Sequence, residues 1–241
     1  MQFEETFTKH SFVIIGHRGA AGVAPENSLQ GFEYALQLGC HGIELDVHRV
    51  QSRLATQDLA VIHDPRLDRT TDASGKVSKL DLEDLQGINV GDGRGLPTLS
   101  QVISLYESHH QHTLLNVELK GIDTATIAAK LLMNSTLENL LVSSFSHDEL
   151  FEFCKLAPAV PVAPLYAKWQ KKWYETAQQL NAKAVNLSAD IVNPQRVKDI
   201  KSAGYKLLVY TVNTKAQARQ LKDMGVDGIF TDFPNLWLTG R

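Results

Sequence analysis

Eight short segments rich in β-branched and apolar residues recur along the chain of 241 residues, and helix-forming segments lie between them. Such alternation is typical of a parallel sheet with helices packed on its outer face. Eight units in a chain near the usual ~250 residues predict an α/β fold, a (β/α)8 barrel of the TIM type, with an open doubly wound sheet as the alternative. No G-x-G-x-x-G turn follows the first strand, which disfavours a dinucleotide-binding open sheet. The predicted strands cover residues 12–16, 42–47, 114–119, 139–144, 160–165, 184–188, 206–212 and 227–231.

Capping residues mark where several of the intervening helices begin. We predict that Asn27 caps the first helix, because Gln30 lies in the capping-box position and Gly39 follows where a helix would end. These signals support the helix interpretation independently of the apolar pattern. Further helix starts are expected at Thr98, Ser146, Asn193 and Thr214.

One part of the chain departs from the regular alternation. Residues 48–63 have the pattern of a small hairpin, followed by a polar stretch at 68–75 and a glycine-rich one at 91–95. We therefore predict a single barrel domain over residues 1–241, with an insertion at 48–97 after the second barrel strand. Long insertions in compact domains are often functional.

Charge and cysteine content exclude several classes of function. The formal net charge is −3, so we expect no broad basic field that could hold nucleic acid or an anionic membrane. Cys40 and Cys154 lack a metal-type spacing and are too few for a disulfide framework. The first residues lack the basic n-region and apolar core of a signal peptide, and no apolar stretch approaches the ~20 residues that span a bilayer. We expect a cytoplasmic protein without stable membrane insertion.

Acidic residues end two of the predicted strands. Glu44 and Asp46 lie two residues apart, so both side chains would face the barrel axis. Two carboxylates inside a barrel repel each other and are costly to desolvate, and a divalent cation would relieve both costs. Glu118 on the next barrel strand could complete an oxygen-only site, which suits Mg²⁺ or Ca²⁺ better than zinc. Salt bridges at the barrel mouth are the alternative interpretation.

Basic residues lie at other predicted strand ends. His17 and Arg18 come where the first strand ends, and His63 ends the predicted hairpin. Although a lone histidine is usually structural, these two could supply the two proton transfers of a phosphodiester cleavage, since the imidazole pKa lies near ~6.5. Lys120 shares a strand face with Glu118, and it could bind a phosphate oxygen or simply pair with that carboxylate.

Nine short motifs follow one another along the chain, most of them at predicted strand ends. They are His17-Arg18-Gly19, Pro25-Glu26-Asn27-Ser28, Glu44-Leu45-Asp46-Val47, His63-Asp64, Leu67-Asp68-Arg69-Thr70-Thr71, Leu96-Pro97-Thr98-Leu99, Asn116-Val117-Glu118-Leu119-Lys120, Thr211-Val212-Asn213 and Gly225-Val226-Asp227-Gly228-Ile229-Phe230-Thr231-Asp232. This ordered set strongly resembles the glycerophosphodiester phosphodiesterases. The resemblance extends over about residues 12–235.

The resemblance implies a TIM-type barrel and the hydrolysis of glycerophosphodiesters, such as deacylated phospholipids, to sn-glycerol 3-phosphate and an alcohol. The implied partner is this small-molecule substrate, and the implied cofactor is one divalent cation, Mg²⁺ or Ca²⁺. The positions that match the family's metal ligands are Glu44, Asp46 and Glu118. Those that match its acid–base pair are His17 and His63, and those that match its phosphate-binding residues are Arg18 and Lys120.

Two features depart from the family pattern. Tyr210 stands where relatives often carry tryptophan, and we expect its ring to form an apolar wall for the substrate, with the hydroxyl as a polar handle. The hairpin turn at 51–58 is longer than the tight Asp-Gly turn of relatives, so the strand that carries His63 could be displaced. Lysophospholipase D-type cleavage of lysophospholipids is a second functional hypothesis. A catalytically silent barrel that binds phosphorylated ligands is a third.

Overall fold

Eight parallel strands close into a barrel in the computed structural model, which describes residues 2–54, 56–110 and 112–238. The barrel strands are β1 (Val13–Gly16), β2 (Gly42–Arg49), β4 (Leu114–Lys120), β5 (Leu140–Ser144), β6 (Val162–Tyr166), β7 (Ala184–Ser188), β8 (Lys206–Tyr210) and β9 (Gly228–Thr231). Strand β1 pairs with β2 on one side and with β9 on the other, which closes the ring. This closure confirms the predicted barrel, and the open-sheet alternative is wrong.

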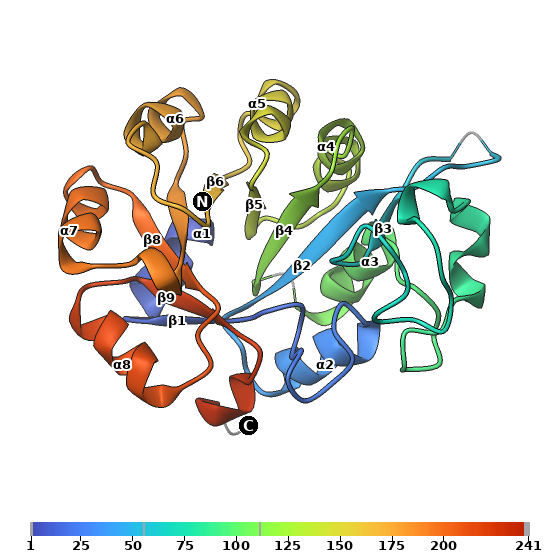
Figure 1. Ribbon diagram of the computed structural model, residues 1–241, viewed down its shortest axis with the longest axis horizontal. Coiled ribbons are helices and arrows are strands. Elements are labelled where there is room, and N and C mark those ends of the chain that lie inside the picture. The colour runs from blue at the N-terminus through green and yellow to red at the C-terminus, as the bar shows by residue number, and fades with distance from the viewer. Residues whose placement is uncertain (1, 55, 111, 239–241) are drawn as a thin grey trace.

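Helices surround the barrel, as Figure 1 shows. Strand residues that face them, such as Leu45, Val117 and Val142, are fully buried in the layer between sheet and helices. Among the described residues, no helix is both long enough and apolar enough to cross a membrane. The helices are α1 (Gln2–Lys9), α2 (Leu29–Gln37), α3 (Leu99–His109), α4 (Ala125–Met133), α5 (His147–Leu156), α6 (Trp173–Gln179), α7 (Pro194–Ser202) and α8 (Lys215–Asp223), with 3₁₀ turns η1 (Val77–Lys79), η2 (Leu82–Gly87), η3 (Ala189–Ile191) and η4 (Pro234–Leu236).

Most of the predicted helix starts are confirmed, but one is wrong. Four predicted caps accept a hydrogen bond from the backbone N–H three residues later, namely Thr98, Ser146, Asn193 and Thr214. Helix α2 is capped by Ser28, whose hydroxyl accepts from the N–H of Gly31, and not by Asn27. Asn27 has φ 54°, and its amide both donates to and accepts from Asp46. Because a buried strand residue engages that amide, the next residue caps the helix.

The chemistry of the inward side chains changes along the barrel axis. At the amino ends of the strands these side chains are apolar, and Phe3 of α1 packs against them, so this helix closes that end. Helix α1 is absent from the elements that the sequence predicts. On β4 the series runs from Leu114 through Asn116 and Glu118 to Lys120, from apolar to charged. The carboxyl ends therefore form the polar mouth where such barrels place their sites.

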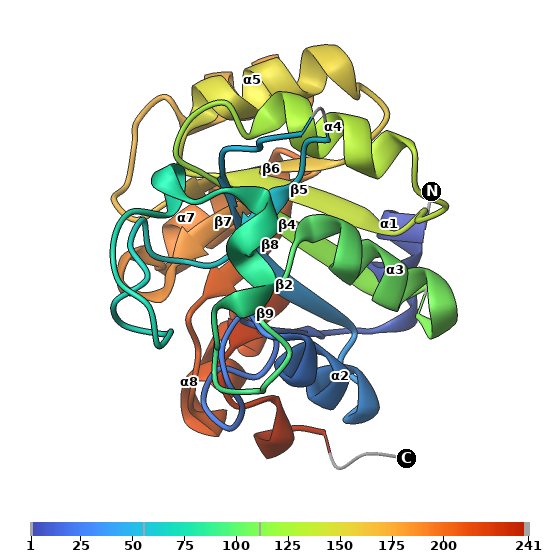
Figure 2. The ribbon, with the colours of Figure 1, turned by 90° about the vertical axis from the view of Figure 1, so that its right-hand side faces the viewer.

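The segment between β2 and α3 packs around a small hydrophobic core of its own, in front of the barrel in Figure 2. Strand β3 (Leu59–Val61) pairs antiparallel with the end of β2, which gives the hairpin expected at 48–63. Ala55, in the long turn of that hairpin, lies outside the described residues. Leu67, Val77 and Leu85 are fully buried in this core, which supports the strand that leads to His63.

His41, at the amino end of the barrel, is expected to make the fold less stable in mild acid. Its Nδ1 accepts a hydrogen bond of 2.9 Å from the backbone N–H of Ile14, and its ring stacks on that of His10. Burial lowers the pKa of His41 to about 4, whereas the unfolded chain takes up the proton near pH ~6.5. The unfolded state therefore binds more protons in between, so stability falls as the pH drops from ~6.5 towards 4.

Melting temperatures near pH ~7 and ~4.5 test this expectation. The variant His41→Gln keeps an acceptor for the backbone N–H, and it should lose less stability on acidification than the wild-type protein. His112→Gln changes an exposed histidine and serves as the control, with a loss like that of the wild type. Equal losses in all three proteins would contradict the role of His41.

Candidate active site

Three carboxylates meet at the carboxyl ends of β2 and β4. Glu44, Asp46 and Glu118 each offer an oxygen, and these oxygens lie within 4.8 Å of one another. The parallel register places Asp46 beside Glu118, and Glu44 lies two residues earlier on the same face of β2. Their residues are only 2%, 1% and 8% exposed, respectively. The structure thus brings the three predicted metal ligands into one buried group, which we call the acidic triad.

Burial and mutual repulsion disfavour three simultaneous negative charges on the acidic triad. Burial, reinforced by the charges of Asp46 and Glu118, raises the pKa of Glu44 well above its usual value. Burial and the charge of Asp46 raise the pKa of Glu118 to about 7. Burial acts on Asp46 in the same direction, but the charges of Lys120 and Arg18 outweigh it and lower the pKa. Near neutral pH the triad therefore holds protons that a metal cation would displace.

The donor set fits a hard divalent cation. All three ligands are carboxylates, and oxygen-only sites suit Mg²⁺ or Ca²⁺. Oε1 of Glu44 is buried, and no described residue gives it a hydrogen bond. A buried carboxylate oxygen without a protein donor is costly, and coordination of a cation would remove that cost.

His17 follows β1 and is held by a carboxylate that follows β9. Its Nδ1 lies 2.6 Å from Oδ1 of Asp232, whose Oδ2 accepts a hydrogen bond of 2.6 Å from Nδ2 of Asn213. An ionised carboxylate only accepts, so Nδ1 carries the proton. Nε2 is directed to the acidic triad, 4.0 Å from Oε2 of Glu44. This arrangement leaves Nε2 available for proton transfer.

Arg18 connects the acidic triad with its surroundings. Its backbone N–H donates to Oε2 of Glu44 at 2.8 Å, while its guanidinium donates to Glu26 at 2.9 Å. Burial opposes its charge, but Asp46, Glu26 and Glu44 outweigh burial and raise the pKa of Arg18. Arg18 also has φ 49°, in the left-handed region that is uncommon for a residue with a side chain. Such strain persists where the surroundings enforce it, and it clusters at functional sites.

His63 reaches the same place from the end of the hairpin. Its Nδ1 lies 2.7 Å from Oδ1 of Asp64, which also accepts hydrogen bonds from Arg69. Nε2 of His48 donates to the backbone carbonyl of His63 at 3.0 Å, which ties the hairpin end to β2. Burial lowers the pKa of His63, although the charge of Asp46 opposes this. These contacts hold His63 in place even though the turn of the hairpin is long.

Lys120 and Tyr210, the remaining predicted binding residues, lie on the other side of the mouth. Nζ of Lys120 is 2.8 Å from Oε1 of Glu118 and 3.4 Å from Oδ1 of Asp46. The same ammonium lies 5.7 Å from the ring centroid of Phe145, which packs edge-to-face on Tyr210 at 5.8 Å. Burial raises the pKa of Tyr210, so its hydroxyl stays protonated, and no described residue bonds it. Tyr210 thus offers the apolar face of its ring and a hydroxyl that no described residue bonds.

A cavity of about 20 Å³ lies between these groups, which is room for a water molecule or an ion. Asn186 on β7 lines it, and neither polar atom of its amide has a partner among the described residues. A buried amide without partners is rare, and it points to a group that binds from outside the chain. The lining residues are His17, Glu44, Asn116, Glu118, Ser143, Leu165, Asn186, Tyr210 and Phe230.

Comparison with known proteins decides the family. The sequence model of the glycerophosphoryl diester phosphodiesterase family matches residues 17–236. The chain belongs to this family. A glycerophosphodiester phosphodiesterase of Caldanaerobacter subterraneus is 34% identical over 238 residues, which cover 92% of this chain and 94% of that protein. One from Bacillus subtilis is 30% identical and covers 92% of this chain and 84% of its own length.

A solved structure shows the same barrel with a ligand bound. It is that of an Oleispira antarctica phosphodiesterase in complex with the product sn-glycerol 3-phosphate. The two chains are 30% identical and superpose with a TM-score of 0.84, over 93% of this chain and 94% of that one. This likeness confirms the TIM-type barrel for the present member of the phosphodiesterase family.

Four residues that contact the predicted site were not predicted from the sequence. Asp232, Asn213 and Asn27 lie in motifs typical of the phosphodiesterase family, but their spacing gives no sign that they contact His17 or Asp46. His48 had a local signal. It lies two residues after Asp46 on β2, so the alternation of side chains along a strand places it on the same face as the acidic triad.

Proposed function

We propose that the chain hydrolyses glycerophosphodiesters to sn-glycerol 3-phosphate and an alcohol, with one divalent cation as cofactor. The observation that carries this proposal is the convergence of His17 and His63 on a buried acidic triad, each imidazole paired with a carboxylate through Nδ1. Curated relatives are named for this activity, and the Oleispira antarctica enzyme holds the product of such a cleavage. These comparisons support the proposed substrate class.

Arg18 and Lys120 are the residues that we assign to the substrate phosphate. A phosphodiester is anionic and resists attack, so fixed positive charge beside it lowers the barrier. The planar guanidinium of Arg18 can donate two hydrogen bonds to a phosphate, whereas the ammonium of Lys120 acts as a point charge. The acidic triad would hold Mg²⁺ or Ca²⁺, which acts as a Lewis acid on phosphoryl oxygens when bound.

His17 and His63 are the residues that we assign to the two proton transfers. One imidazole accepts the proton of the attacking nucleophile, and the other donates a proton to the alcohol oxygen as its bond to phosphorus breaks. The nucleophile is either a water molecule or the 2-hydroxyl of the glycerol group, and in the second case a water molecule then opens the cyclic phosphate. Asp232 and Asp64 keep the proton on Nδ1 of each ring, so that Nε2 does the transfer. Tyr210 lines the cavity beside them and contributes an apolar wall for the substrate.

Release of sn-glycerol 3-phosphate is the direct test of this function. The purified protein should release it from glycerophosphocholine and glycerophosphoethanolamine when Mg²⁺ or Ca²⁺ is supplied, and EDTA should stop the reaction. The product is measured with a coupled glycerol 3-phosphate dehydrogenase. No release from any glycerophosphodiester with either cation would refute the proposal. Binding without turnover in a calorimetric titration would then support the catalytically silent barrel.

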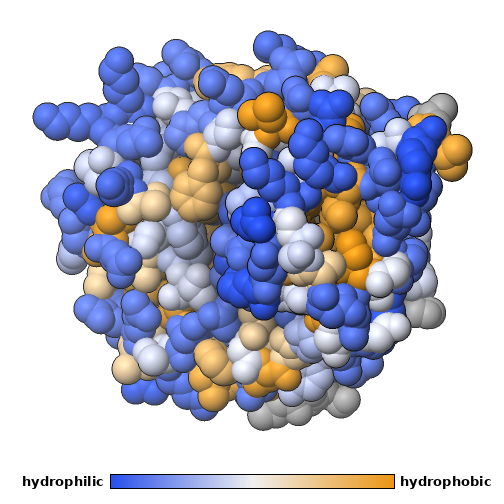
Figure 3. All heavy atoms as spheres, turned by 45° about the vertical axis from the view of Figure 1, so that its right-hand side comes forward, coloured by the Kyte–Doolittle hydropathy of each residue, from blue (hydrophilic) through white to orange (hydrophobic). Residues whose placement is uncertain are grey.

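Exposed apolar side chains at the barrel mouth favour lysophospholipids as a second candidate substrate class. Val23, Ile122 and Phe145 follow β1, β4 and β5, and they are 45%, 76% and 43% exposed. The face seen in Figure 3 is mainly hydrophilic, with apolar side chains in separate small areas, which favours the deacylated substrates. Turnover on lysophosphatidylcholine and on glycerophosphocholine separates the two classes. Faster turnover on the lysophospholipid would reverse our preference.

We also propose a cytoplasmic location. Cys40 and Cys154 are both free thiols, as is usual in a reducing compartment. Fractionation of the source cells, with activity assayed in each fraction, tests this. Activity recovered mainly outside the cytoplasm would contradict it.

A further inference from the structure

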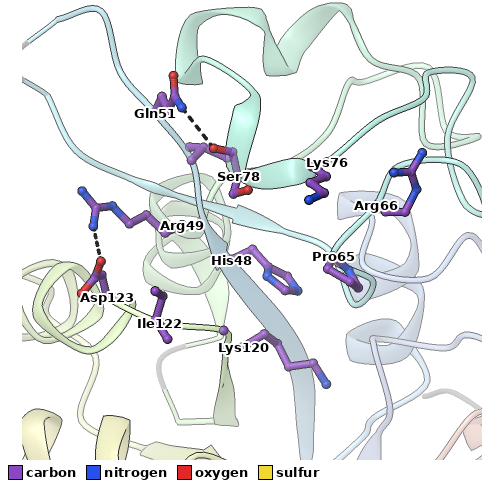
Figure 4. Close-up of a pocket in the computed structure, with 12 residues that line it drawn as sticks. His48, Arg49, Gln51, Pro65, Arg66, Lys76, Ser78, Lys120, Ile122 and Asp123 are labelled. Carbon is purple, nitrogen blue, oxygen red and sulfur yellow. Dashed lines mark hydrogen bonds and ion pairs between the residues drawn. The ribbon is translucent and has the colours of Figure 1, made fainter.

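A groove of about 620 Å³ runs beside the acidic triad, between the hairpin segment and the loop after β4. Figure 4 shows Pro65, Arg66 and Lys76 on one wall and Ile122 on the other. Lys120 lies at its inner end, where its ammonium binds Glu118 of the triad. The groove therefore adjoins the proposed reaction site through a single side chain, and its volume suits a small organic molecule.

Cationic side chains predominate in the lining of the groove, although the whole chain has a formal net charge of −3. Four cationic side chains line it, and Asp123 is the one carboxylate in its lining. Asp123 pairs with Arg49 on the outer side. Lys76 lines the groove and has no ion-pair partner in the part of the chain that the structure describes. The cationic lining residues are Arg49, Arg66, Lys76 and Lys120.

Two of these cations are placed side by side by the backbone. An isolated antiparallel bridge joins Arg66 to Lys76, with the N–H of Val77 donating to the carbonyl of Pro65 at 3.1 Å. Like charges directly opposite each other in such a pair are destabilising. Asp68 binds the guanidinium of Arg66 and relieves part of this cost, but it leaves the charge of Lys76 uncompensated. The backbone hydrogen bonds of the bridge support the fold, but the two neighbouring positive charges do not, whereas an anion in the groove would be stabilised by them.

The groove also lies on the side of the mouth that His63 occupies. The ring of His48 lines the groove and donates a hydrogen bond to the carbonyl of His63. Pro65, two residues after His63, lines it as well. If His63 protonates the leaving alcohol, that alcohol departs on the side of the mouth where this groove lies.

We propose that the groove receives the alcohol part of the substrate and favours alcohols that carry an anionic group, such as a second phosphate. This inference rests on the proposed phosphodiesterase function and deepens it, because it names the preferred class of leaving alcohol. Lys76 and Arg66 bind the distal anion, and the exposed side chain of Ile122 covers the carbon chain between. Lys76 acts on the distal group alone, away from the reacting atoms.

Two substrates that differ by one distal glycerophosphoryl group, and so by one anionic charge, test the preference. Bis(glycerophospho)glycerol releases an anionic alcohol, whereas glycerophosphoglycerol releases neutral glycerol. For the wild-type protein we expect kcat/KM per scissile bond to be higher for the anionic alcohol by about fivefold, the size of an exposed charge interaction. The ratio should fall towards one as salt rises, because the groove is open to solvent.

The variant Lys76→Glu should reduce this ratio by about tenfold, since it turns an attraction into a repulsion. Lys76→Gln should reduce it less, and it covers the case in which the charge reversal disturbs folding. Lys79→Glu is the matched control, because Lys79 is an exposed lysine three residues away, in the 3₁₀ turn that follows Lys76, and does not line the groove. This control should keep the wild-type ratio.

The outcomes separate this inference from the function on which it rests. Cleavage of both substrates with a ratio near one, or an unchanged ratio in both Lys76 variants, would overturn the groove assignment and leave the phosphodiesterase function standing. A ratio that falls equally in Lys79→Glu would also overturn it, because the effect would then be one of overall charge. No cleavage of either substrate with metal supplied would remove the function and the inference together.

Discussion

Replacing His17 or His63 with alanine is expected to lower kcat by about 10²–10⁴-fold while the barrel stays folded. Each imidazole is fixed through Nδ1 to a carboxylate, at 2.6 Å from Asp232 and at 2.7 Å from Asp64, so each keeps Nε2 for proton transfer. The side chains of His17 and His63 are 17% and 32% exposed and belong to none of the hydrophobic clusters, so their removal costs little apolar packing. Activity should therefore fall without a matching loss of stability.

Turnover at saturating glycerophosphocholine, together with thermal unfolding, measures both effects. His112→Ala removes an exposed histidine and is the control that should retain the wild-type rate. Asp232→Asn should also lower kcat, because an amide no longer holds the proton on Nδ1 of His17 in the same way. A rate near that of the wild type in either histidine variant would exclude that residue from the mechanism.

Removal of the divalent cation is expected to abolish activity, and its addition should stabilise the protein. Charge stabilisation by a bound cation amounts to several kcal/mol, so EDTA should lower turnover by about 10³-fold or more. A cation at ~100 times its Kd adds about 2.7 kcal/mol to the free energy of unfolding. For a chain of this size that raises Tm by about 5–10 °C.

Proton release should accompany cation binding. The raised pKa of Glu44, and that of Glu118 at about 7, mean that protons occupy the acidic triad near neutral pH before a cation binds. Binding displaces them, so affinity should increase with pH. Calorimetry in buffers of different ionisation enthalpy measures the number of protons released. Cation binding that is independent of pH and releases no protons would contradict this account.

The variant Glu44→Gln tests whether the cation acts at the acidic triad or through a general effect of salt. It keeps the shape of the side chain and removes one ligand charge, so it should lose both the activity and the rise in Tm on cation addition. In EDTA it should be about as stable as the wild type, because the raised pKa of Glu44 already keeps this buried carboxyl protonated when no cation is bound. Glu152→Gln alters an exposed carboxylate on α5 and should respond to the cation as the wild type does. An equal rise in Tm in both variants would place the cation elsewhere.

Local chemistry explains how much of the fold could be predicted. The eight barrel strands and four of the five helix starts follow from side-chain patterns within a few residues of each element. Asn27 shows the limit of such patterns. It has a good capping side chain, but Asp46, nineteen residues further on, engages its amide, so Ser28 caps the helix instead. Long-range contacts of this kind leave no trace in local spacing.

The candidate site also has one part that local spacing predicts and another part that it does not. Period-two spacing along the strands predicts that Glu44 and Asp46 share one face, and the register of β2 and β4 brings Glu118 to them. The roles of these residues, and the single-domain organisation, stay predictions. Helix α1, which closes the far end of the barrel with Phe3, was not predicted, although its first turn is acidic and its last turn carries Lys9.

The sequence by itself determined the alternation of strands and helices, the inward direction of the strand carboxylates, and the family to which the ordered motifs belong. Only the tertiary structure decided which distant groups touch: Asp232 holds His17 across 215 residues of sequence, and Arg66 lies beside Lys76 in a cationic groove. The physical reason is closure of the barrel. Local propensities act over a few residues, whereas pairing β1 with β9 joins the two ends of the chain and so sets the contacts that orient the site.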